Sequence, residues 1–162
     1  MGSKQKGFSL IELLIVVTII LVIAAVAIPN LLRSRMSANE ASAVSSMRTM
    51  ITAEIIYSGT YTIGFSADLP SLSDGGTPTN CIAPAVATAS SACLIDPSLA
   101  NGTKSGYFFT YKPGGAGGSN STYTLNADPI SLASGQRHFY ADANDVLRVN
   151  LTAPASQSDP AL

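Results

Sequence analysis

The apolar run from Phe8 to Ile28 constrains this chain more than any other feature. As an α-helix with a rise of about 1.5 Å per residue, the run is about 31 Å long, close to the apolar thickness of a bilayer. Lys4 and Lys6 precede it, and cationic residues next to a span stay on the cytoplasmic side. The sequence therefore predicts one membrane-spanning helix with a cytoplasmic N-terminus, and export of the chain that follows Pro29.

A carboxylate inside this apolar run needs an explanation. Glu12 would cost several kcal/mol if it stood unpaired in lipid. One interpretation places it near enough to the interface to reach the headgroups. The other requires a cation, which a cut just before Phe8 would create as a new α-amino group. In that case the amine of a neighbouring subunit would pair with Glu12.

The residues around this position, Lys6 to Glu12, read KGFSLIE. This heptapeptide, followed by the apolar run, resembles the prepilin peptidase site of type IV pilins and pseudopilins. The resemblance implies that the leader, residues 1–7, is removed after Gly7, that Phe8 becomes an N-methylated N-terminus, and that Glu12 acts in assembly. It also matches the apolar run and the proline near its end to Leu13–Ile28 and Pro29.

An ordinary secretory signal is a competing interpretation. Ala25, Val26 and Ala27 fit an A-x-A cleavage site, and cleavage there would release a soluble domain that begins at Ile28. Glu12 within the apolar region argues against this signal, as does the helical pattern that continues past the cut.

Beyond the apolar run the chain still favours a helix, with a kink expected at Pro29. The sequence predicts one bent helix from Phe8 to about Ser58, with Gly59 as its terminator. Four apolar residues at helical spacing predict the face that packs on the head domain: Val44, Met47, Ile51 and Ile55. Five charged residues supply polar positions: Arg33, Arg35, Glu40, Arg48 and Glu54.

A Ser-, Thr-, Ala-, Gly- and Pro-rich segment, Thr60–Gly106, predicts a long loop with short helical pieces around Ser66–Leu72. Cys81 and Cys93 lie in this loop. In an exported chain two cysteines predict one disulfide, although two buried free thiols are the alternative. Many type IV pilins place their disulfide near the C-terminus, so no adhesive role is transferred to that region.

The last third of the chain predicts a small antiparallel sheet. Strands are expected at Tyr107–Tyr111, Thr122–Ala127, His138–Ala141 and Val146–Asn150, with a flexible turn at residues 112–121. The expected fold is α+β, a long bent N-terminal helix packed on this sheet. We divide the chain into a leader (1–7), a membrane or filament-core half-helix (8–28), an exported half-helix (29–58), a head (59–151) and an irregular tail (152–162).

Motifs for catalysis are missing from the sequence. His138 is the one histidine and lies in a predicted strand, and no catalytic triad, phosphate loop or Cys-x-x-Cys motif occurs. We expect no cofactor and no enzymatic activity. A weak calcium candidate consists of Asp142, Asn144 and Asp145, but this stretch is also an ordinary hairpin turn. The net charge of −1 gives no basic surface for nucleic acid.

These features predict the structural subunit of a type IV pilus. Its expected partners are further copies of itself in a helical homopolymer, the prepilin peptidase, an assembly platform, and the bacterial inner membrane before export to an extracellular filament. The alternatives are a pseudopilin of a type II secretion system, in a short periplasmic filament, and a membrane-anchored or secreted binding module that never polymerises.

Overall fold

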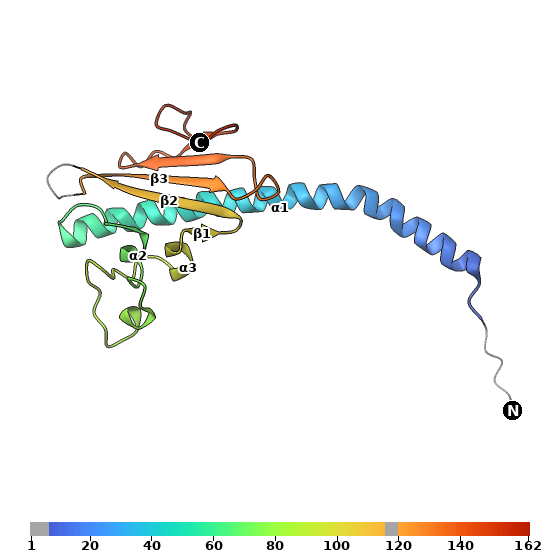
Figure 1. Ribbon diagram of the computed structural model, residues 1–162, viewed down its shortest axis with the longest axis horizontal. Coiled ribbons are helices and arrows are strands. Elements are labelled where there is room, and N and C mark those ends of the chain that lie inside the picture. The colour runs from blue at the N-terminus through green and yellow to red at the C-terminus, as the bar shows by residue number, and fades with distance from the viewer. Residues whose placement is uncertain (1–6, 116–119) are drawn as a thin grey trace. The chain divides into compact units, whose positions relative to one another are not determined.

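The computed structural model describes residues 7–115 and 120–162 and has an α+β fold (Figure 1). A long helix, α1 (Leu10–Tyr61), is followed by a five-stranded antiparallel sheet. This architecture confirms the fold class predicted from the sequence. Contacts between residues divide the chain into two compact units, which meet in sequence between Arg35 and Met36. The second unit, Met36–Leu162, contains the sheet and is called the head below.

Helix α1 differs at both ends from the prediction. It begins at Leu10, because Ser9 occupies the N-cap position and its backbone N–H donates to Glu12 Oε2 at 2.9 Å. At the other end the prediction that Gly59 terminates the helix is wrong. The helix continues to Tyr61, whose ring contacts the Tyr57 ring with centroids 4.8 Å apart and so supports a further turn.

Helical structure also continues through Pro29. The ring of a proline removes one backbone hydrogen bond from a helix without necessarily ending it. The kink at this residue stays a prediction.

The sheet has its strands in sequence order, β1-β2-β3-β4-β5, and all neighbours are antiparallel. The strands are β1 (Thr103–Lys104), β2 (Tyr107–Gly114), β3 (Thr122–Pro129), β4 (His138–Asp142) and β5 (Arg148–Asn150). The two-residue strand β1 was not predicted. Strand β2 extends to Gly114, so the turn predicted from residue 112 starts too early, and residues 116–119 of that turn lie outside the described part of the chain.

The core of the head lies between α1 and one face of the sheet. Met47, Met50 and Tyr57 of α1 are buried, and the inward-facing strand residues include Tyr107 and Phe139. The prediction that Ile55 belongs to the packed face is wrong, since its side chain is half exposed. Glu54 takes the inward position instead, in a stripe that recurs every three or four residues: Glu40, Ala43, Met47, Met50, Glu54 and Tyr57.

Two carboxylates on α1 therefore lie inside the head rather than at polar positions. Glu40 accepts hydrogen bonds from the backbone N–H of Gln136 at 2.9 Å and from Arg137 Nε at 2.7 Å. Burial alone would raise the pKa of Glu40, but these donors outweigh it and hold the pKa below its usual range.

The pKa of Glu54 is shifted in the opposite direction from that of Glu40. It accepts from the backbone N–H of Ser66 at 2.9 Å and from the Ser66 hydroxyl at 2.5 Å. No cation is paired with it among the described residues. Burial therefore dominates and raises the pKa of Glu54, and the Ser66 hydrogen bonds offset only part of this effect.

The segment between α1 and the sheet contains three short helices, α2 (Leu69–Leu72), η1 (Pro78–Cys81) and α3 (Pro97–Ala100). The helical piece expected around residues 66–72 is α2. The predicted disulfide is present between Cys81 and Cys93. Backbone hydrogen bonds also join the two sides of the segment, from Cys93 N to Ser73 O at 2.9 Å and from Leu94 N to Leu72 O at 2.7 Å.

The C-terminal tail, residues 152–162, has no regular helix or strand but is held along β5. Arg148 donates to the backbone oxygen of Asp159 at 2.7 Å, and Asn150 donates to the Asp159 carboxylate at 2.9 Å. Backbone bonds join Val149 N to Pro160 O at 3.1 Å and Leu162 N to Leu147 O at 2.8 Å. The tail therefore occupies the outer side of the last strand.

Candidate assembly surface

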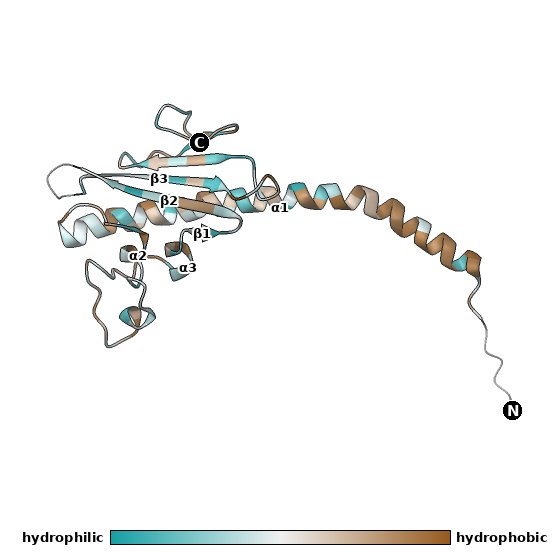
Figure 2. Cartoon of the chain, in the orientation of Figure 1, coloured by the Kyte–Doolittle hydropathy of each residue, from teal (hydrophilic) through white to brown (hydrophobic). Residues whose placement is uncertain are grey.

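The N-terminal half of α1 consists almost entirely of apolar residues, which colour most of this part of the helix brown in Figure 2. From Phe8 to Leu32 every large apolar side chain that the structure describes is exposed to solvent in the single chain. Within the described residues, α1 is the one helix whose length and composition would allow it to cross a membrane. A helix that is apolar all round is stable only when something else covers it.

The polar groups of this half-helix are largely satisfied by the helix itself. Thr18 Oγ1 donates to the backbone oxygen of Leu14 at 2.7 Å. Glu12 Oε2 is occupied by Ser9 N, whereas Glu12 Oε1 has no hydrogen-bond partner within the described residues. One carboxylate oxygen, close to the start of α1, is thus open to a donor from another molecule.

Gly7 and Phe8 lie before α1, in a segment without regular structure. The Phe8 side chain is 76% exposed. A Cβ built on Gly7 would meet no atom within 4 Å, so the fold of this chain does not require glycine there. The bond between Gly7 and Phe8 is therefore accessible, and a demand for glycine would come from whatever binds this segment.

Two cations end the apolar half-helix. Arg33 and Arg35 are exposed, and neither has a hydrogen-bond or ion-pair partner among the described residues.

Glu40 and Glu54 are the residues whose roles the sequence interpretation missed. Their place in the buried three-and-four stripe of α1 is a signal that could have revealed them.

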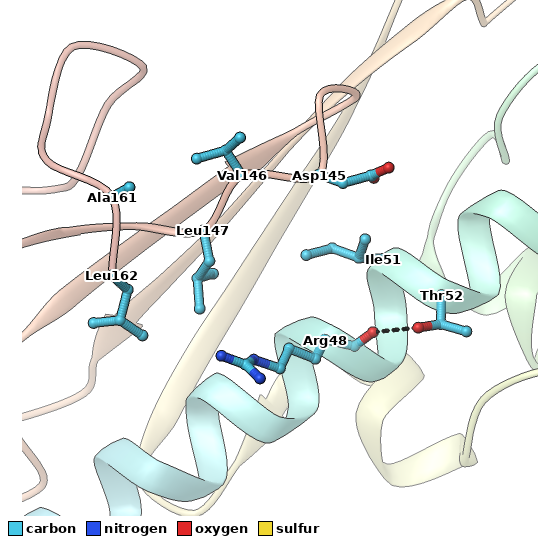
Figure 3. Close-up of a pocket in the computed structure, with 8 residues that line it drawn as sticks. All are labelled: Arg48, Ile51, Thr52, Asp145, Val146, Leu147, Ala161 and Leu162. Carbon is cyan, nitrogen blue, oxygen red and sulfur yellow. Dashed lines mark hydrogen bonds between the residues drawn. The ribbon is translucent and has the colours of Figure 1, made fainter.

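The head contains no catalytic arrangement in the part that the structure describes. Figure 3 shows a pocket between α1, the β4–β5 turn and the C-terminus, lined mainly by aliphatic side chains together with Arg48 and Asp145. Thr52 in this pocket donates to the backbone oxygen of Arg48 at 2.9 Å. His138 lies on β4 as predicted, away from this pocket, with its Nδ1 2.6 Å from Asp128 Oδ1.

The proposed calcium loop has the geometry of a turn. Asp142 Oδ1 accepts from the backbone N–H of Asn144 at 2.9 Å, and the Asp142 backbone oxygen accepts from Asp145 N at 3.0 Å. Asp145 has a φ of 61°. Among the described residues, no group of three His, Cys, Asp or Glu side chains is placed to hold a metal ion. Local backbone hydrogen bonds account for this sequence.

Comparison with known proteins decides the family. The family model of the prokaryotic N-terminal methylation motif matches residues 2–28. The type IV wide pilus major component PilA4 of Thermus thermophilus is 42% identical over 96 residues, which cover 57% of this chain and 72% of that protein. This chain belongs to the type IV pilin family. The type IV major pilin protein PilA of Myxococcus xanthus is 39% identical to this pilin over 53 residues, which cover 33% of the pilin and 24% of the relative. No solved structure matches it significantly.

Membership of the type IV pilin family accounts for the exposed apolar half of α1 and for the role of this chain as a structural protein. Pilins are structural proteins, and this pilin is not an enzyme. The exposed apolar half of α1 is the membrane anchor of the pilin, and it overlaps the methylation motif, which matches residues 2–28.

Proposed function

We propose that this pilin is the repeating subunit of a type IV pilus. Prepilin peptidase cuts it after Gly7, Phe8 is methylated, and the N-terminal half of α1 then moves from the inner membrane into the core of a filament. The observation that carries the proposal is the apolar surface on all sides of that half-helix. This surface is stable in lipid and equally stable when many copies pack against one another, but it is not stable in water.

The same proposal gives each terminal residue a role. The cytoplasmic leader with Lys4 and Lys6 sets the orientation before cleavage. Once Phe8 is the N-terminus, its amine on one subunit pairs with the free oxygen of Glu12 on the next and sets the register of addition. The exposed Gly7–Phe8 bond supports these roles, as does Glu12 Oε1, which has no hydrogen-bond partner within the described residues.

The first test is the intact mass and N-terminal sequence of the protein extracted from membranes. A chain that begins at Phe8 and carries the mass of one added methyl group is the expected result. A soluble chain that begins at Ile28 would mean an ordinary secretory signal and would end the pilin-processing proposal.

The second test concerns assembly. Glu12→Ala removes the proposed partner of the amine, so we expect processing to continue while surface filaments are lost, as counted by electron microscopy. Thr18→Ala is the matched control, because the one hydrogen bond of the Thr18 hydroxyl within the described residues lies inside its own helix, and filaments should form normally. Normal filaments from Glu12→Ala would contradict the role of Glu12.

A pseudopilin would share the leader and the apolar helix. The two curated relatives are both described as major components of pili, which favours a pilus and a major subunit. Abundant extracellular filaments that contain this chain would support the pilus, whereas a chain confined to the periplasm during protein secretion would support the pseudopilus.

A further inference from the structure

The head has an open apolar pocket beside α1, which Figure 3 shows in close-up. Its volume is about 480 Å³, within the range of pockets that hold another molecule. Ile51 of α1 and Leu147 of the β4–β5 turn are buried side chains at its wall, and Val146 and Leu162 line it from more exposed positions. The fold of a single head thus leaves part of this apolar lining uncovered.

The same head carries an apolar projection at another place. Residues 129–136, between β3 and β4, read PISLASGQ and have no charge. Leu132 is 84% exposed and Ile130 is 61% exposed, and neither belongs to the buried core. Because Leu132 is so exposed, it does not occupy the pocket of its own head. Each head therefore presents an apolar projection and an apolar pocket that do not meet each other.

Hydrogen bonds fix the projecting loop on two sides. On the side of α1, Asn39 donates to the backbone oxygen of Ser134 at 2.9 Å. On the side of the sheet, the N–H of Ile130 donates to the backbone oxygen of Gly106 at 2.9 Å. Figure 1 shows this loop beside α1, beyond the tip of β3. Leu132 therefore projects from a preorganised loop, which loses little conformational entropy on binding.

The polar groups of the pocket and the loop are complementary. The Arg48 side chain at the pocket is exposed, and its guanidinium has no hydrogen-bond or ion-pair partner among the described residues. In the part of the loop that the structure describes, the backbone oxygens of Leu132 and Ala133 accept no hydrogen bond. These oxygens suit a guanidinium donor. Asp145, the other charged residue that lines the pocket, meets no like charge in the loop.

We propose that the β3–β4 loop of one head binds in the pocket of a second copy, with Leu132 between Ile51 and Leu147. This inference rests on the homopolymer proposed above. The loop is attached to α1 at Asn39 and the pocket begins at Arg48, about 14 Å further along the helix. The contact joins two different surfaces, so each added copy leaves one loop and one pocket free. Such a contact generates a ring or an open filament rather than a closed dimer.

The contact is small and therefore weak for two heads that are free in solution. The proposed packing of the apolar half-helices would hold the heads at a high effective concentration, at which a weak contact is populated. The loop and the pocket would thus select how neighbouring heads are placed, whereas the half-helices supply most of the affinity between subunits.

Cross-linking in filaments tests this contact. The full chain receives Leu132→Cys together with Val146→Cys, and purified filaments are treated with a short bismaleimide reagent. Cys81 and Cys93 are bonded to each other and do not react. We expect a ladder of covalent dimers, trimers and longer species on denaturing gels, because each copy offers one thiol to each of two neighbours. Each single-cysteine variant should remain monomeric.

The matched control moves the first cysteine to a different exposed loop. Val86 is 82% exposed and lies within the segment that the disulfide closes. Val86→Cys together with Val146→Cys should give no ladder. Filaments of the Leu132→Cys and Val146→Cys chain that yield no cross-linked species would overturn the proposal, as would an equal ladder from the control. Dimers from Leu132→Cys alone would assign the loop to a contact between two identical loops and would also overturn it.

Leu132→Asp gives a second measurement that does not depend on thiols. A charge in the apolar pocket is costly, so we expect about tenfold fewer filaments by electron microscopy. Leu132→Met and Val86→Asp should assemble normally. The thermal unfolding of Leu132→Asp, followed by circular dichroism, should match that of wild type because Leu132 lies outside the core. Normal filament numbers from Leu132→Asp would refute the contact.

Failure of the proposed function gives a different result from failure of this contact. A wild-type chain that does not begin at Phe8 after processing, or that forms no filaments, refutes the pilus subunit and the head contact together. Normal wild-type filaments, with no cross-link between the loop and the pocket in the double-cysteine chain, refute the head contact alone.

Discussion

Glu40 and Glu54 are carboxyl groups on one helix whose pKa values are displaced in opposite directions. Hydrogen bonds from Gln136 and Arg137 stabilise the charge on Glu40, whereas burial without a cation destabilises the charge on Glu54. Because proton binding is linked to folding, these two pKa shifts make the stability of the fold depend on pH in opposite ways. Glu40 stabilises the fold above its unfolded-state pKa, and this contribution is lost as the pH falls through the lowered folded-state value. Glu54 contributes stability below its unfolded-state pKa, and this contribution is lost as the pH rises through the raised value.

Glu40→Gln should therefore destabilise the head at neutral pH. The amide keeps an acceptor for the backbone of Gln136 but presents a donor or a neutral oxygen to the Arg137 guanidinium. We expect a loss of about 2 kcal/mol in the free energy of unfolding at pH 7, since hydrogen bonds to charged groups contribute on this scale. The difference from wild type should shrink as the pH falls from about 5 towards 3, as measured by urea unfolding monitored by circular dichroism.

Glu54→Gln is the matched comparison for Glu40→Gln. It retains an acceptor for Ser66 N and removes a buried charge, so its stability at pH 7 should equal or exceed that of wild type by up to about 1 kcal/mol. The variant should also lose the decline in stability that the wild type shows as the pH rises through the folded-state pKa of Glu54. Equal losses from both variants at neutral pH would mean that the two carboxylates have the same role, contrary to their surroundings.

At the scale of elements, the disulfide is one of several links that hold the segment between α1 and the sheet. Backbone bonds from Cys93 and Leu94 to the α2 region hold its second half, and the Tyr57 hydroxyl donates to Ala89 O at 2.7 Å. Residues 82–88 between these links depend mainly on the disulfide and on local turns. The disulfide thus fixes a surface loop more than it fixes the core.

Replacing Cys81 and Cys93 together by Ser should leave the head folded and loosen this loop. A short-range bridge contributes about 3 kcal/mol by the chain-entropy estimate, and we expect the cost here to be at or below that value because the backbone bonds remain. Limited proteolysis followed by mass spectrometry should find new cleavage sites confined to residues 82–91. New cleavage within β3 or β4 would show that the bridge supports the core itself.

At the scale of the whole molecule, the exposed apolar surface that must be covered and the folded head belong to different parts of the chain. The head from Met36 to Leu162 has its own core, which includes the second half of α1. The exposed apolar side chains are concentrated before Arg33. We therefore expect a chain that begins at Met36 to be a soluble monomer without detergent and to unfold in one cooperative transition, as measured by size-exclusion chromatography and thermal denaturation. An insoluble product would mean that the first unit is needed for folding.

The sequence predicted most of this organisation because its strongest patterns are local. An apolar run, a cleavage motif and alternating strands each reveal themselves within a few residues, so the anchor, the α+β fold and the paired cysteines could be expected. The end of α1 could not be predicted in this way, because the contact between the Tyr57 and Tyr61 rings supports a helix that continues past Gly59. The burial of Glu54 depends on Ser66, and that of Glu40 on Gln136 and Arg137, which lie far away in sequence. The short strand β1 exists only because β2 pairs with it.

The tail that lies along β5 affects how the heads behave when their local concentration is high. The proposed membrane anchoring would bring the heads of several subunits close together, and an open strand edge invites pairing with the same edge of a neighbour. Here the backbone groups of Leu147 and Val149 already bond to Leu162 and Pro160. The tail therefore covers this edge of the sheet and leaves fewer backbone groups free to pair with the edge of another head.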